Sequence, residues 1–90
     1  MIYVFATSRA ENPEQHMKVF EKIKPFMEGM GIKALAAYRS LEDEKEQHVL
    51  FEAPDAEVFT EFMMAPISAE KMKEATLLAT PDIQYMLKIW

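Results

Sequence analysis

The feature that most constrains the fold is an apolar segment near the start of the chain. Residues Ile2–Arg9 (IYVFATSR) are rich in β-branched and aromatic side chains, and the first five of them are all apolar. A strand with alternating apolar and polar residues buries one face, whereas a continuous apolar run predicts burial of both faces. The sequence therefore predicts a strand that needs a covering layer on each side.

Helix and strand signals alternate along the rest of the chain. Asn12 followed by Pro13 marks a helix start, because Asn caps N-termini and Pro fits the first turn. The apolar stripe of this helix extends to Met30, and we expect Pro25 to kink or break it. The remaining expected elements are strands Ile32–Arg39 and Gln47–Ala53, a helix from the cap Asp55 to Ala65-Pro66, a short helix from the cap Ser68, and a last strand Asp82–Trp90.

The order β-α-β-β-α-β predicts a ferredoxin-like α+β fold, formed by residues 1–90 as a single domain. Right-handed crossovers give the antiparallel sheet the order 4-1-3-2 and bring both helices to one face. The other face then carries large apolar side chains whichever register holds, either Tyr3 and Phe5 or Ile2 and Val4 from the first strand. Such a patch exceeds those of ordinary monomers, so we predict a homodimer that packs sheet to sheet.

Composition excludes several classes of protein. Fifteen acidic against ten basic residues give a net charge of −5, the wrong sign for binding nucleic acid or an anionic membrane surface. The chain has no cysteine, which excludes disulfides, thiolate metal sites and thiol nucleophiles. No apolar run approaches the ~20 residues that span a bilayer. The first residues lack a basic start and a cleavable signal pattern, so we expect a cytoplasmic protein.

The whole chain resembles the dimeric α/β-barrel superfamily, which includes small domains of the antibiotic-biosynthesis-monooxygenase type. The similar segments are Met1–Thr7, Lys24–Met27, Tyr38–Asp43 and Phe51–Ala56. The resemblance implies a homodimer whose two sheets form a shared barrel. It does not imply one activity, because a single fold hosts many functions.

The catalytic residues of this superfamily do not transfer to the present sequence. Its cofactor-independent monooxygenases use an asparagine and tryptophans in a pocket, and its haem-degrading members use a histidine of the second helix. Here the single tryptophan is Trp90, the single asparagine is the helix cap Asn12, and Asp55–Ala75 contains no histidine. We therefore expect no cofactor, no stoichiometric haem and no unaided oxidation of aromatic polyketide-type substrates.

The candidates for catalysis are His16, Arg9, Glu52 and His48. His16 is a candidate general base at a pocket mouth, and the alternative is a surface histidine. Its expected neighbours there are Thr7, Arg9 and Glu52. We expect the first and third strands to run parallel, which separates His16 from His48 and excludes a metal shared by the two. His48, ~13 Å along the strand from Glu52, is expected at a strand end or in the lining of the barrel. We predict no metal site.

Aromatic and methionine residues on the helical stripes predict either a filled core or an adaptable apolar pocket. The candidate pocket residues are Phe20, Phe26, Met27, Phe59, Phe62 and Met63. We predict that the homodimer binds a small apolar or aromatic molecule between helices and sheet. The alternatives are a monooxygenase-like or isomerase-like enzyme of the same superfamily, and a structural or regulatory dimer without a ligand.

The end of the last predicted strand carries the single tryptophan. Ile83, Tyr85, Leu87 and Ile89 share one face of this strand, and Trp90 lies on the other. If the apolar row packs under the helices, Trp90 points toward the partner subunit. We therefore expect the dimer, rather than its own chain, to bury Trp90.

Overall fold

The computed structural model describes all residues, 1–90, and contains four strands and three helices. The elements confirm the expected order of strands and helices, with a third short helix before the last strand. In chain order they are β1 (Ile2–Arg9), α1 (Pro13–Gly29), β2 (Lys33–Arg39), β3 (Glu46–Ala53), α2 (Ala56–Met64), α3 (Pro66–Glu74) and β4 (Asp82–Met86).

The strands form one sheet in the order β2-β3-β1-β4, which is the predicted order 4-1-3-2. Every neighbouring pair is antiparallel. The expectation that β1 and β3 run parallel is therefore wrong. The crossover through α1 makes β1 and β2 parallel, and the tight β2–β3 connection then reverses β3.

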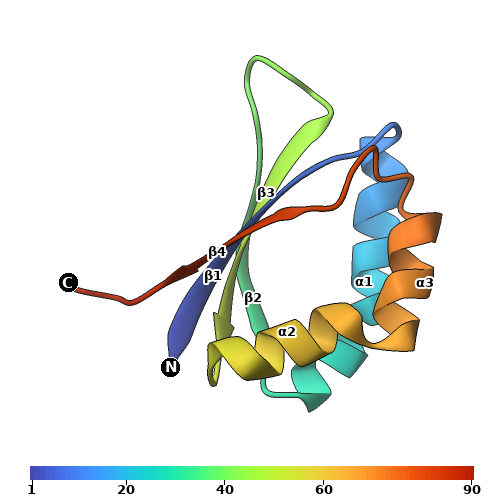
Figure 1. Cartoon of the computed structure of the whole chain (residues 1–90). Coiled ribbons are helices and arrows are strands. Elements are labelled where there is room, and N and C mark those ends of the chain that lie inside the picture. The colour runs from blue at the N-terminus through green and yellow to red at the C-terminus, as the bar shows by residue number, and fades with distance from the viewer.

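The three helices lie on one side of the sheet and leave its other side open (Figure 1). Side chains of β3 alternate accordingly: Val49 and Phe51 are buried under the helices, whereas Leu50 is partly exposed on the open face. The core between helices and sheet is formed by Val4, Ile23, Met27, Ile32, Val49, Phe51, Ala53, Phe59 and Phe62. None of the helices is long and apolar enough to cross a membrane.

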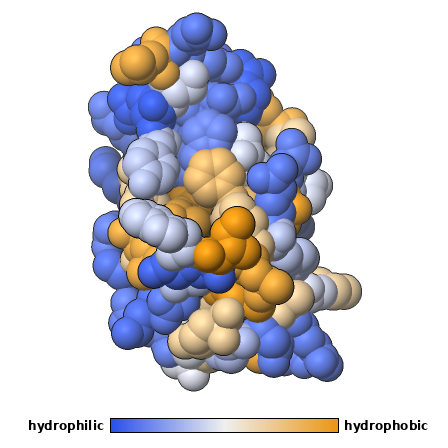
Figure 2. Space-filling view, turned by 90° about the vertical axis from the view of Figure 1, so that its left-hand side faces the viewer, coloured by the Kyte–Doolittle hydropathy of each residue, from blue (hydrophilic) through white to orange (hydrophobic).

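The open face is apolar at its centre. Cross-strand pairing aligns Leu50 with Phe5, and Tyr3 with Met86. The alternation resolves the register left open by the sequence, because Val4 is fully buried on the helix side and Tyr3 and Phe5 face outward. Figure 2 shows this side of the molecule, with hydrophobic side chains gathered in the middle and hydrophilic ones around them.

Helix α1 begins as predicted but continues through Pro25. The Asn12 side chain accepts a hydrogen bond from the backbone N–H of Gln15, and Pro13 occupies the first turn. The helix runs unbroken from Pro13 to Gly29, so a break at Pro25 is wrong, whereas a kink there stays a prediction. Pro25 is exposed on the outer side of the helix. A missing backbone hydrogen bond costs less on the solvent side of a helix, where water can satisfy the unpaired carbonyl.

Helix α3 begins earlier than the sequence suggested. Asp55 caps α2 as expected, by accepting from the backbone N–H of Val58 at 2.8 Å. The next helix begins at Pro66, with Ala65 at its N-cap position. Ser68 is therefore inside α3 and does not cap it. Proline is favoured in the first turn of a helix, because its fixed φ suits the helix and its missing N–H would be unpaired there in any case. The helix therefore begins at Pro66, two residues before Ser68.

The last strand is shorter than predicted. Strand β4 ends at Met86, whereas the sequence suggested Trp90. Ile83 and Tyr85 do face the helices, since Ile83 packs against the core and Tyr85 contacts Phe59 edge-on at 6.3 Å. Beyond Met86 the chain extends away from the sheet (Figure 1), and Trp90 is fully exposed to solvent. Its own chain does not bury Trp90, and burial by a partner subunit stays a prediction.

Candidate functional site

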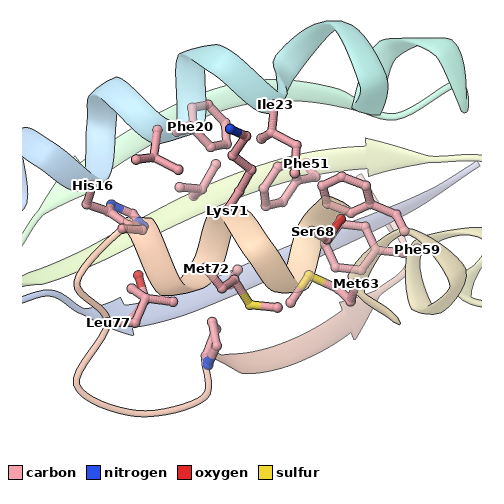
Figure 3. Close-up of a pocket in the computed structure, with 17 residues that line it drawn as sticks. His16, Phe20, Ile23, Phe51, Phe59, Met63, Ser68, Lys71, Met72 and Leu77 are labelled. Carbon is pink, nitrogen blue, oxygen red and sulfur yellow. The ribbon is translucent and has the colours of Figure 1, made fainter. Parts of the chain in front are cut away.

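A pocket lies between the helix layer and the sheet (Figure 3). Its volume is about 100 Å³, and twelve of its seventeen lining residues are hydrophobic. The sheet contributes Ala6 and Ser8 from β1, and Val49 and Phe51 from β3. The rest of the lining comes from the helices and the α3–β4 connection: His16, Val19, Phe20, Ile23, Phe59, Phe62, Met63, Ser68, Lys71, Met72, Ala75, Leu77 and Pro81.

Four of the six residues predicted to form a pocket line this one, namely Phe20, Phe59, Phe62 and Met63. Met27 is fully buried in the core and does not reach the pocket. Phe26 lies outside it and packs against Phe62, with ring centroids 6.1 Å apart. Both residues lie on α1 beyond Ile23, the last residue of this helix that lines the pocket.

His16 lies at one end of the pocket, on the first turns of α1 (Figure 3). Its Nδ1 atom forms a hydrogen bond with Oε1 of Gln47 on β3. The Gln47 side chain is buried, with 4% exposure, and its Nε2 donates to the carbonyl of Pro13 at 3.4 Å. The carbonyl of Pro13 can only accept, so Gln47 presents its own oxygen to His16.

Burial lowers the pKa of His16 from its ordinary value of 6.5, and the hydrogen bond with Gln47 partly opposes this shift. Transfer from water into a less polar environment disfavours the charged imidazolium, and burial therefore lowers the pKa of a histidine. His16 is therefore neutral at pH 7 and carries one N–H and one free lone pair.

Ser68 is the second polar group of the pocket wall. Its side chain is 2% exposed, and its Oγ atom has no hydrogen-bond partner. An unpaired buried hydroxyl costs roughly 1–3 kcal/mol. A helical pattern places this serine at the pocket, because Ser68, Met72 and Ala75 follow one another at spacings of four and three residues. This spacing could have predicted a buried Ser68 from the sequence. We instead expected Ser68 to cap the N-terminus of the helix, because serine is common at that position.

One charged side chain, 23% exposed, contributes to the pocket wall. Lys71 lines the pocket, and its Nζ donates to Glu74 at 3.0 Å on the same helix. A lysine commonly covers an apolar surface with its methylene stem while its charge stays solvated. The one charge at the pocket wall is therefore paired within α3, and the other polar residues of the wall, Ser8, His16 and Ser68, carry neutral hydrogen-bonding groups.

His48 belongs to a separate cluster on the open face of the sheet. Its ring stacks on Phe5 with centroids 5.4 Å apart. Its Nε2 contacts the Glu46 carboxylate at 3.3 Å, and its Nδ1 lies 2.9 Å from the Thr7 hydroxyl. The carboxylate only accepts, so Nε2 of His48 carries a proton. His48 thus belongs to the open face of the sheet and lies apart from the pocket.

The structure does not bring the predicted neighbours of His16 together. Because β1 and β3 are antiparallel, His16 and His48 lie at the same end of the sheet, on opposite faces, rather than at opposite ends as predicted. Thr7 and Arg9 face the open side, and Glu52 pairs with Tyr3 at the far end of β3. No group of three or more histidine, aspartate or glutamate side chains is arranged to hold a metal ion.

Arg9 forms an ion pair with Asp43 in the β2–β3 loop, with 2.8 Å between Nη2 and Oδ2. A hydrogen bond from the backbone N–H of Lys45 lowers the pKa of the Asp43 carboxyl, and Arg9 adds to this effect. Both side chains are largely exposed, so the pair adds little to stability. Arg9 therefore shapes a loop rather than a reaction site.

Comparison with known proteins gives similarity in structure alone. No protein-family model matches the chain, and no curated protein matches it. A proposed antibiotic biosynthesis monooxygenase from Bordetella bronchiseptica superposes with a TM-score of 0.83 at 14% identity, over 99% of this chain and 97% of that one. The chain has the ferredoxin-like fold of these proteins.

Two further solved structures support the same fold. A proposed antibiotic biosynthesis monooxygenase from Caulobacter crescentus has a TM-score of 0.73 at 20% identity, over 99% of this chain and 90% of that one. SnoaB, a cofactor-independent oxygenase from Streptomyces nogalater, has a TM-score of 0.72 at 12% identity, over 99% of this chain and 92% of that one. These identities establish a common ferredoxin-like fold and leave the activity to be argued from the site.

Proposed function

We propose that the protein is a homodimer that binds a small apolar or aromatic molecule in the pocket between helices and sheet. The observation that carries this proposal is the buried, unpartnered hydroxyl of Ser68 in a pocket wall where twelve of the seventeen residues are hydrophobic. Buried polar groups almost always have partners, so one that faces a pocket without a partner in the chain favours a partner from outside it. Convergent polar groups in an apolar pocket are typical of ligand sites.

The volume of the pocket limits the size of the ligand. About 100 Å³ is below the ~300–1,000 Å³ typical of drug-sized ligands, and an apolar cavity of ~150 Å³ can hold benzene. The pocket as it stands is smaller than this benzene-holding cavity, so its ligand has at most one small ring. Met63 and Met72 line the pocket, and rotation of these flexible side chains would admit a somewhat larger ligand.

The second half of the proposal is pairing through the open face. Tyr3, Phe5 and Leu50 lie at its centre, and Met86 is 37% exposed beside them. Charged residues of both signs surround this centre: Lys33, Glu52, Glu46, Arg9 and Asp82. A second copy in reversed orientation would cover the apolar centre and bring acidic and basic side chains of the rim together.

The ligand half of the proposal is tested by measuring binding of toluene, with ligand-observed NMR, to the wild type and to a pocket-filling variant. Ser68→Leu places a larger side chain in the pocket wall, whereas Glu70→Leu places the same side chain on the exposed side of α3. We expect the wild type and Glu70→Leu to bind and Ser68→Leu to lose binding. Absence of binding to the wild type at millimolar toluene would contradict the proposal.

Two alternatives rest on particular observations. The similarity of fold to proteins described as monooxygenases, with a neutral histidine in the pocket wall, favours a monooxygenase-like or isomerase-like enzyme. The small pocket volume favours a structural or regulatory dimer without a ligand. Oxygen consumption or substrate isomerisation would support the enzyme, and a dimer that binds none of a panel of small aromatic molecules would support the structural role.

A further inference from the structure

The hydrogen bonds around His16 define which ligand atom the pocket can receive. Gln47 donates from Nε2 to the Pro13 carbonyl, and its Oε1 therefore faces His16. An amide oxygen only accepts, so Nδ1 of His16 must carry the proton. In neutral imidazole the other nitrogen, Nε2, is then an acceptor, and it forms no hydrogen bond within the chain.

We infer that Gln47 is a positioning residue that holds His16 with Nε2 as a hydrogen-bond acceptor, so that the pocket selects neutral molecules carrying a hydrogen-bond donor. This inference rests on the proposed ligand site and specifies the chemistry of its ligand.

The surroundings of His16 support selection of a neutral ligand. Around the pocket, β1 contributes Ala6 and Ser8, and β3 contributes Val49 and Phe51, none of them charged. The charge from α3 is that of Lys71, which pairs with Glu74. A carboxylate in the pocket would meet the lone pair of Nε2 and would lose its hydration without a free cation.

A neutral donor group makes the opposite match. A hydroxyl of the ligand donates to Nε2, and this bond replaces one that the hydroxyl makes with water. Such a bond contributes about five- to tenfold to affinity in a partly buried site. The apolar body of the ligand packs against the aromatic wall formed by Phe20, Phe51 and Phe59 (Figure 3).

The test compares phenol, which has a donor, with toluene, which matches it in size and has no donor, and with benzoate, which is slightly larger and carries a negative charge. We expect phenol to bind wild-type protein about five- to tenfold more tightly than toluene at pH 7.5, and benzoate to bind more weakly than either. Phenol affinity should fall at acid pH as His16 protonates and Nε2 ceases to accept, whereas toluene affinity should change little.

Substitution of Gln47 separates positioning from simple structural support. In Gln47→Glu the carboxylate still accepts from Nδ1 but stabilises the imidazolium, so the midpoint of the phenol pH profile should move to higher pH. In His16→Phe the phenol affinity should fall to that of toluene. Two-dimensional ¹H–¹⁵N NMR of the wild type without ligand should show the Nδ1–H tautomer of His16, which needs no variant to fold.

The outcomes distinguish the inference from the proposed function. Equal binding of phenol and toluene at every pH, or an Nε2–H tautomer, would overturn the inference and leave the ligand site in place. Tighter binding of benzoate than of phenol would overturn selection of neutral ligands. If none of the three probes binds, both the proposed function and the inference fail.

Discussion

Ser68 keeps a buried hydroxyl without a partner, which costs stability in the ligand-free protein. We predict that Ser68→Ala raises the free energy of unfolding by about 1 kcal/mol, because the desolvation cost disappears and alanine favours a helix interior. Urea unfolding followed by circular dichroism measures this change. The same variant should bind polar aromatic probes less tightly. A loss of stability in Ser68→Ala would mean that the hydroxyl already has a partner.

His16 gives the stability a pH dependence of defined sign. Its pKa is lower in the folded protein than the value of 6.5 expected for the unfolded chain. Between these two values the unfolded state binds more protons, so stability falls as the pH drops below about 6.5 and levels off below the folded-state pKa.

Thermal unfolding of the wild type and His16→Gln between pH 7.5 and pH 5 tests this sign. The free energy of unfolding of the wild type minus that of His16→Gln should fall toward acid pH, because only the wild type loses the contribution of neutral His16. Both proteins share the remaining titratable groups, which makes the variant its own control. If the free energy of unfolding of the wild type minus that of the variant rises toward acid pH, the pKa of His16 is not lowered in the folded protein.

Residue-level patterns explain what the sequence could reveal about the site. The aromatic stripe predicted Phe20, Phe59 and Phe62 in the pocket because helical periodicity reports the inward face directly. It did not predict Gln47, although this residue shares the strand parity of Val49 and Phe51. The role of a polar side chain that points into the core depends on its hydrogen-bond partner. The partner of Gln47 is His16, which lies 31 positions away in the sequence, so the sequence alone did not reveal the pair.

At the scale of elements, helix α1 carries a proline that it tolerates. Pro25→Ala restores a backbone N–H inside a continuous helix, and we predict a gain of about 1–2 kcal/mol in the free energy of unfolding. The gain stays below the full ~3 kcal/mol helix-interior cost because proline also restricts the unfolded chain. Urea unfolding measures it, with Lys22→Ala on the exposed side of α1 as control. Unchanged or reduced stability would argue against an unbroken α1.

The C-terminal segment Leu87–Trp90 does not pack against the rest of the chain, since Leu87, Ile89 and Trp90 are all largely exposed. We predict that the partner subunit buries Trp90 in the dimer. Its fluorescence should then be blue-shifted at high concentration and shift to the red on dilution, as the dimer dissociates. Emission near that of free tryptophan in the intact dimer would show that Trp90 remains solvated.

Some sequence signals predicted the ends of helices and strands correctly, and others did not. The caps Asn12 and Asp55 predicted helix starts correctly, because each side chain bonds a backbone N–H only three residues away. The alternation Ile83–Ile89 predicted too long a β4, because a strand continues only while a neighbour supplies hydrogen bonds. Strand β1 pairs with β4 only from Tyr3 to Thr7, opposite Met86 to Asp82.

At the scale of the whole molecule, the element order was sufficient to predict the fold, since right-handed crossovers leave few arrangements of four strands. The same order also fixes the direction of β3, because the crossover makes β1 and β2 parallel and the β2–β3 connection reverses the chain. The expectation of parallel β1 and β3 misapplied this topology, and it therefore placed His16 and His48 at opposite ends of the sheet. The open face follows from the fold itself: three helices cover one side of the sheet, and apolar side chains of β1, β3 and β4 remain on the other.

Pairing through that face is the central claim, and native mass spectrometry of the purified full chain at micromolar concentration tests it directly. We predict a species of twice the 10.4 kDa chain mass, together with a population that retains a small molecule. Leu50→Lys should give single chains because it puts a charge in the apolar centre, whereas Met64→Lys on the helix layer should stay dimeric. A wild-type spectrum containing single chains alone would contradict the claim.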